Sequence, residues 1–134
     1  MSDEQPGSVK ADDAAALKGK TGLTRVAYAF SYSLAGLRAA FRDEAAFRQE
    51  LLLAALLIPL AFFMPVGSVG KALMIASVLL VLIVELLNSA TEALADGISS
   101  DTHEFIKKAK DIGSAAVLIA LINVPVVWLL VLFG

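Results

Sequence analysis

Three long stretches without a charged side chain constrain this chain of 134 residues more than any other feature. They cover residues 51–70, 72–84 and 112–134. A helix needs roughly 20 apolar residues to cross the hydrocarbon core of a bilayer, and the first and third stretches are long enough alone. The second is long enough only if its helix continues through Glu85 and Glu92. The sequence therefore predicts three transmembrane helices, at 49–66, 70–96 and 112–133.

The composition agrees with a membrane protein. Hydrophobic residues make up 58% of the chain and the mean hydropathy is +0.78, which exceeds what ordinary soluble domains show. The chain has no cysteine, which excludes disulfides. It has a single histidine, His103, which strongly disfavours a zinc site of nitrogen and sulfur ligands. The net charge of −2 indicates little about partners, and we expect no nucleic acid among them.

The basic residues predict the orientation. All except Lys71 lie before the first predicted span or between the second and third. Positively charged loops stay on the cytoplasmic side, so the N-terminus and the 97–111 loop are predicted to be cytoplasmic and the C-terminus to lie outside. The polar face of the second span then opens toward the cytoplasm.

The N-terminal part divides into a tail and a helix. Residues 1–20 are polar and lack the apolar core of a signal peptide, so we expect a disordered tail. From 24 to 48, apolar side chains recur every three or four residues, which predicts an amphipathic helix in the membrane interface. The membrane-embedded domain is thus predicted to be residues 21–134, an all-α bundle. Because three short spans make a small bundle, neighbouring subunits of a homo-oligomer are expected to complete any internal site.

Polar residues on one face of the second span indicate a functional site. Glu85, Asn88 and Glu92 are spaced by three and four residues, and Asp96 follows four residues later. This spacing places them on one helix face. An ionisable side chain within the membrane is costly and usually functional, so the face is predicted to handle a cation or a proton. For Asp96, a plain helix-end carboxylate in the headgroup region is an equal alternative.

The segment before the third span adds further candidates. Lys110, Asp111 and Ser114 lie at its predicted cytoplasmic mouth. A lysine can hold phosphate oxygens, and a carboxylate pair with Mg²⁺ would complete a phosphoryl-transfer site. The chain contains neither a P-loop motif nor a dinucleotide-binding glycine motif. These observations leave an enzyme and a proton-coupled transporter both open.

Four motifs are informative together: ELLNSATEALAD at 85–96, AKDIGSAAV at 109–117, GLRAAFRDEAAFRQE at 36–50 and TGLTR at 21–25. With these motifs the chain closely resembles the prokaryotic diacylglycerol kinases, small integral-membrane lipid kinases unrelated to soluble kinases. The resemblance covers residues 20–134. It implies transfer of the γ-phosphoryl group of ATP, with Mg²⁺, to diacylglycerol, giving phosphatidic acid. It also implies a homotrimer in the bacterial inner membrane, with the C-terminus in the periplasm.

The resemblance also implies roles for individual residues. Glu85 is similar to the catalytic base, and Glu44 and Glu92 to the metal-binding carboxylates. The implied ATP contacts are Arg25, Tyr32, Asp101, Thr102, His103, Lys110 and Asp111. The implied lipid-binding or supporting residues are Ser33, Arg38, Gln49, Asn88 and Ser114.

Two departures from the family pattern bear on the acceptor lipid. Leu34 stands where the family usually has tryptophan, and Gly97 where an arginine is common. Neither touches the implied catalytic groups. They leave undecaprenol, which close relatives phosphorylate, as an alternative acceptor. A small proton-coupled exporter and a non-catalytic assembly factor are the alternatives from other classes.

Overall fold

The computed structural model describes residues 21–98 and 103–134, and every regular element in that part of the chain is an α-helix. The helices are α2 (Gly22–Asp43), α3 (Ala45–Phe63), α4 (Ser68–Ile98) and α5 (Glu104–Phe133). The last three are long and apolar enough to cross a membrane, which confirms the predicted all-α membrane fold. The predicted tail at 1–20 and the site candidates Asp101 and Thr102 lie outside the described residues. The chain divides into two compact units after Ala39.

The first unit contains α2 up to Ala39. Its apolar side chains recur along the helix, and Val26, Phe30 and Leu37 are exposed. An exposed apolar stripe on a basic helix is the pattern of a helix that lies in the membrane interface.

The break between α2 and α3 falls at Glu44, four residues before the predicted end of the interfacial helix at 48. Glu44 has an extended backbone, with φ −114° and ψ 105°. The Arg48 guanidinium donates to the carbonyl oxygens of Phe41 (2.7 Å) and Arg42 (3.0 Å). These carbonyls belong to the last turn of α2. The carbonyl oxygens of a last turn receive no hydrogen bond from later residues of the same helix. Arg48 therefore stabilises the end of α2 from the first turn of α3.

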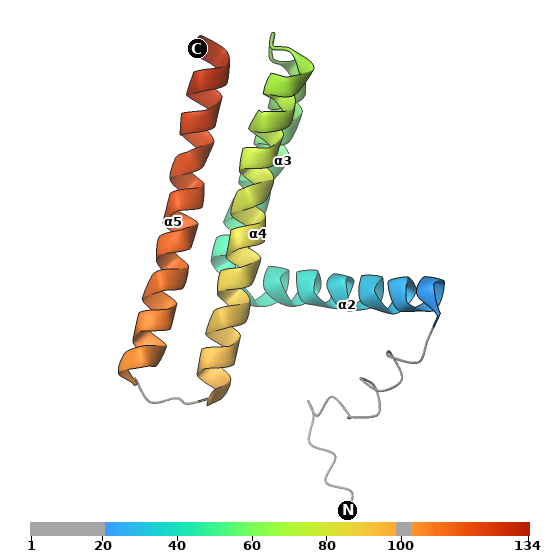
Figure 1. The fold of residues 1–134 in the computed structure, drawn as a ribbon, viewed down its shortest axis with the longest axis vertical. Coiled ribbons are helices and arrows are strands. Elements are labelled where there is room, and N and C mark those ends of the chain that lie inside the picture. Colours follow the sequence, from blue (N-terminus) through green and yellow to red (C-terminus); the bar gives the residue numbers. More distant parts are fainter. Residues whose placement is uncertain (1–20, 99–102) are drawn as a thin grey trace, which may run out of the picture. The chain divides into compact units, whose positions relative to one another are not determined.

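The second unit contains three long helices that run alternately up and down, with α4 in contact with both α3 and α5 (Figure 1). Helix α3 ends at Phe63, because the next residue, Met64, precedes Pro65 and is extended; a residue before proline is driven out of the helical region. Helices α3 and α5 continue through Pro59 and Pro125.

A hydrophobic core of this unit lies around Trp128. Its buried residues are Ala54, Ala61, Met74, Val78 and Trp128. The indole Nε1 of Trp128 donates to the Met74 carbonyl oxygen at 3.2 Å, and the Ser77 hydroxyl donates to the same oxygen at 2.7 Å. We call the region of Ala61, Met74, Ser77 and Trp128 the tryptophan half of the bundle.

Candidate functional site

The centre of the site is the Glu85 side chain in the middle of α4. This residue is only 5% exposed. It lies fourteen residues after Lys71, roughly 21 Å along the helix, and Glu92 lies roughly 10 Å further. If Lys71 marks one edge of a hydrocarbon core of roughly 30 Å, Glu92 reaches the other edge and Glu85 lies inside it. Burying a carboxylate charge at this depth is costly, so a buried carboxylate here indicates a functional role.

Two further carboxylates lie near Glu85. Those of Glu44, at the start of α3, and of Glu92, two turns further along α4, both interact electrostatically with it. The carboxylates implied as base and metal ligands thus lie near enough for Glu44 and Glu92 to act electrostatically on Glu85. The Ser89 hydroxyl is also close to Glu85, yet it is buried and makes no hydrogen bond of acceptable geometry.

Asn88 fills the space between α4 and α5. Its Oδ1 is buried and accepts no hydrogen bond from the described residues. A Cβ atom on Gly113 would clash with this oxygen. Glycine at 113 is therefore what lets the asparagine side chain fit.

One ion pair joins the polar ends of α4 and α5, and a second lies within α5. Lys110 Nζ lies 2.7 Å from Asp96 Oδ1 on α4, and Lys107 Nζ lies 2.6 Å from Asp111 Oδ2 one turn along the same helix. Two of the implied ATP contacts, Lys110 and Asp111, are thus paired within the chain. Because both pairs are largely exposed, a bound polyanion can displace them at low cost.

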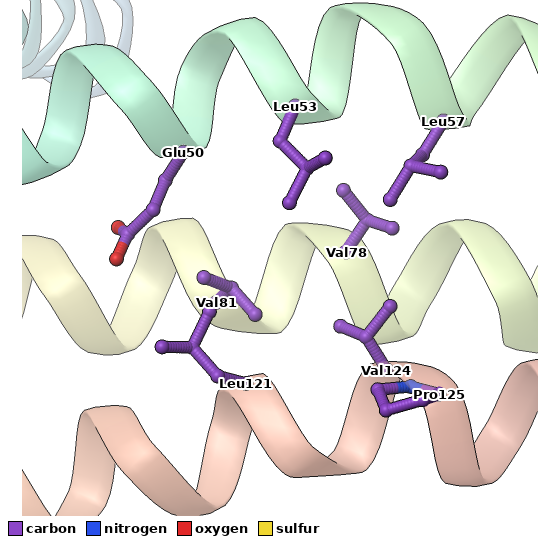
Figure 2. A pocket seen from close by; sticks show the side chains of 8 residues that line it. All are labelled: Glu50, Leu53, Leu57, Val78, Val81, Leu121, Val124 and Pro125. Atoms are coloured by element: carbon purple, nitrogen blue, oxygen red, sulfur yellow. The ribbon is translucent and has the colours of Figure 1, made fainter.

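Glu50 lies beside a cavity of about 140 Å³ between the three helices (Figure 2). The other lining residues are apolar: Leu53, Leu57, Val78, Val81, Leu121, Val124 and Pro125. Its Oε2 is buried without a hydrogen-bond partner, and its carboxylate interacts electrostatically with that of Glu85. We call the region of Glu50, Glu85, Asn88 and Ser89 the carboxylate half.

The remaining candidates are exposed. Arg25, Tyr32, Ser33 and Arg38 lie on α2, where the Ser33 hydroxyl donates to the Ala29 carbonyl oxygen at 2.9 Å. Gln49 on α3 and Ser114 on α5 are exposed as well. His103 precedes α5 and its ring stacks on Phe105, with the centroids 5.7 Å apart.

Two site residues are not among those predicted from the sequence. Glu50 lies one residue before the first uncharged stretch, and this position is a usable signal. Gly113 lies within the AKDIGSAAV motif. A glycine inside a helical pattern is costly and indicates a close approach, but the sequence alone does not name the partner.

The donor set of the site suits one kind of cation. Within residues 21–98 and 103–134, no three His, Cys, Asp or Glu side chains are close enough to hold a metal ion alone. Mg²⁺ is usually held by one or two carboxylates together with substrate phosphates and water. Glu44 and Glu92 fit that pattern. Together, the fold and the site define a small integral-membrane protein with an acidic site that suits a phosphate-bearing substrate.

Comparison with known proteins gives the family. The sequence model of the prokaryotic diacylglycerol kinases matches residues 31–132. The chain is 56% identical to a diacylglycerol kinase of Pseudomonas aeruginosa, over 87% of this chain and 95% of the relative. It is 50% identical to the diacylglycerol kinase of Escherichia coli K12, over 85% and 93%. It is 39% identical to one of Helicobacter pylori, over 80% and 84%.

The chain belongs to the prokaryotic diacylglycerol kinase family. It is therefore a membrane-embedded lipid kinase, and the family implies ATP as its co-substrate. The predicted family and enzyme class are confirmed.

Proposed function

We propose that this protein transfers the γ-phosphoryl group of ATP to the hydroxyl of diacylglycerol, with Mg²⁺, and so forms phosphatidic acid. The observation that carries the proposal is the buried Glu85 carboxylate, placed close to those of Glu44 and Glu92. A base flanked by two potential metal ligands is what in-line phosphoryl transfer to an alcohol requires.

The chain's own residues divide the work. Glu85 accepts the proton of the lipid hydroxyl as that oxygen forms its bond to the γ-phosphorus, and the bond from this phosphorus to the ADP oxygen breaks. Glu44 and Glu92 would hold Mg²⁺, which when bound neutralises phosphate charge. The implied nucleotide contacts Arg25, Tyr32, Asp101, Thr102, His103, Lys110 and Asp111 would hold ATP. Ser33, Arg38, Gln49, Asn88 and Ser114 would line or support the lipid site.

The assembly and orientation follow the same proposal. We infer a homotrimer in the bacterial inner membrane, with the N-terminus cytoplasmic and the C-terminus periplasmic. The positive-inside pattern of the basic residues supports this orientation. The many exposed apolar side chains of α3, α4 and α5 provide surface for both lipid and neighbouring subunits. Because the chain has no cysteine, labelling of Gly134→Cys in intact cells tests the side on which the C-terminus lies.

The decisive experiment is transfer of ³²P from labelled ATP to diacylglycerol and undecaprenol, side by side, with purified protein in mixed micelles. We expect magnesium-dependent labelling of diacylglycerol that greatly exceeds that of undecaprenol, and none after chelation of the metal. Preferential labelling of undecaprenol would replace the proposed acceptor. The absence of labelling of either lipid would refute the phosphotransferase, and substrate movement driven by a pH gradient in proteoliposomes would then identify a transporter.

A further inference from the structure

Gly113 on α5 packs against the Asn88 side chain on the polar face of α4. A Cβ atom at this position would clash with Asn88 Oδ1, and Asn88 Cγ would lie 3.3 Å away. The three nearest atoms all belong to Asn88. By contrast, a Cβ on Gly97, in the last turn of α4, would meet nothing within 4 Å. The requirement for glycine at 113 therefore comes from one side chain.

This contact fixes the direction of the Asn88 amide. One α-hydrogen of Gly113 takes the place of the missing Cβ, so it lies against Oδ1 and can act as a weak donor, as such groups do between packed helices. Since the amide group is planar, holding Oδ1 against α5 turns the NH₂ group away from α5. No hydrogen bond within residues 21–98 and 103–134 uses that NH₂ group. Two donors therefore stay available.

These donors lie next to the reacting groups of the proposed function. Asn88 is three residues after Glu85 and four before Glu92, on the same helix face. An N–H donor held beside a base can stabilise charge that develops on a phosphoryl or attacking oxygen, and such donors act only if they are held in place beforehand.

We propose that Gly113 is a positioning residue for the phosphoryl transfer: its missing side chain lets Asn88 lie against α5 with its NH₂ group directed at the substrate. This inference rests on the proposed function, because the amide direction matters only if a phosphoryl acceptor reacts at Glu85. Gly113 itself touches no substrate and acts through Asn88.

The test compares three glycine substitutions in the full chain. Gly113→Ala should lower kcat at least tenfold while KM for ATP and for the lipid changes less than threefold. Gly97→Ala, which adds a methyl group into open space, should change neither. Gly70→Ala is the second control, because its Cβ would lie 2.9 Å from Val131 Cγ1 in the tryptophan half; it should lower the unfolding temperature and leave kcat within twofold. A kcat for Gly113→Ala within twofold of the wild type would overturn the proposal.

A double-mutant cycle separates positioning from packing. In an Asn88→Ala background the clash is gone, so Gly113→Ala should have no further effect on kcat or on folding. A further tenfold loss in that background, or a double variant that fails to fold when Asn88→Ala alone folds, would overturn the proposal. This comparison also decides the matter if Gly113→Ala alone does not fold.

A readout independent of turnover keeps the two proposals distinguishable. The side-chain NH₂ resonances of Asn88, assigned by their loss in Asn88→Ala, should shift in Gly113→Ala and stay unchanged in Gly97→Ala. If these shifts appear but no lipid is phosphorylated, the contact stands and the proposed function fails. If phosphorylation is observed but the resonances do not move in Gly113→Ala, the positioning role fails alone.

Discussion

The two halves of the helix bundle satisfy their buried polar groups in opposite ways. In the tryptophan half, Ser77 and Trp128 both donate to the Met74 carbonyl oxygen. In the carboxylate half, three side-chain oxygens are buried without hydrogen bonds: Glu50 Oε2, Asn88 Oδ1 and Ser89 Oγ. Among the described residues, every buried side-chain nitrogen or oxygen atom without a hydrogen bond lies in this half. The same three helices build both halves.

This difference separates what holds the fold from what is reserved for substrate. A buried polar atom without a partner costs free energy of folding, and native proteins keep few of them. Of these atoms, Asn88 Oδ1 lies against Gly113 and leaves the amide NH₂ group available, whereas the Glu50 and Ser89 oxygens are left for partners that arrive with the ligand. The unpaired polar atoms of the carboxylate half lower the free energy of unfolding. The hydrophobic core of the tryptophan half must offset this loss.

The largest effect should follow from removing the base. Glu85→Gln keeps the volume of the side chain but cannot accept a proton, so we expect kcat to fall by roughly 10²–10⁴. The unfolding temperature should not fall, because a buried charge is removed. The measurement is initial-rate phosphorylation of diacylglycerol beside thermal unfolding in detergent, with Glu104→Gln as a matched change outside the site. Turnover near that of the wild type in a folded variant would exclude Glu85 as the base.

The converse experiment acts on the tryptophan half. Met74 is fully buried, and Met74→Ala should lower the free energy of unfolding by about 2–5 kcal/mol because it leaves a cavity. Activity per folded molecule should fall less than tenfold. The control is Leu73→Ala, since Leu73 is 51% exposed on the same helix. A specific loss of turnover in folded Met74→Ala protein would contradict the division between the halves.

A smaller pair of substitutions compares single polar groups. Glu50→Met removes an unsatisfied oxygen and fills the apolar cavity, so we expect the free energy of unfolding to rise by roughly 1–3 kcal/mol. Ser77→Ala removes a satisfied donor and should lower it by about 0.5–1.5 kcal/mol. Chemical denaturation in mixed micelles measures both. If the two changes have the same sign, the contrast between the halves is wrong.

The fold could be predicted because its signals are local. Uncharged length predicts the spans, and spacings of three and four residues place Glu85, Asn88 and Glu92 on one face. Contacts between helices could not be read in this way. The break at Glu44 depends on Arg48 reaching back to α2, the fit of Asn88 depends on Gly113, and the pairing of Lys110 with Asp96 joins residues on separate helices. Hydropathy carries no information about which side chains meet.

The smallest effect concerns an ion pair outside both halves. Arg42 and Asp43 form a bidentate pair with N–O distances of 2.9 and 3.1 Å. The hydrogen bonds from Arg42 lower the pKa of Asp43 below its usual value. The stabilisation is therefore present above the ordinary carboxyl pKa and is lost as the pH falls through the lower folded value. Because the pair is exposed, screening keeps its contribution small.

A carboxyl titration by ¹³C NMR measures this shift directly. We expect Asp43 to titrate below a carboxyl group in an unfolded peptide and to return to the ordinary value in Arg42→Gln. Asp43→Asn should change neither turnover nor the unfolding temperature at neutral pH beyond experimental error, although the next residue is Glu44. If Asp43→Asn instead abolishes magnesium-dependent activity, the polar region needed for catalysis extends beyond the carboxylate half into the end of α2.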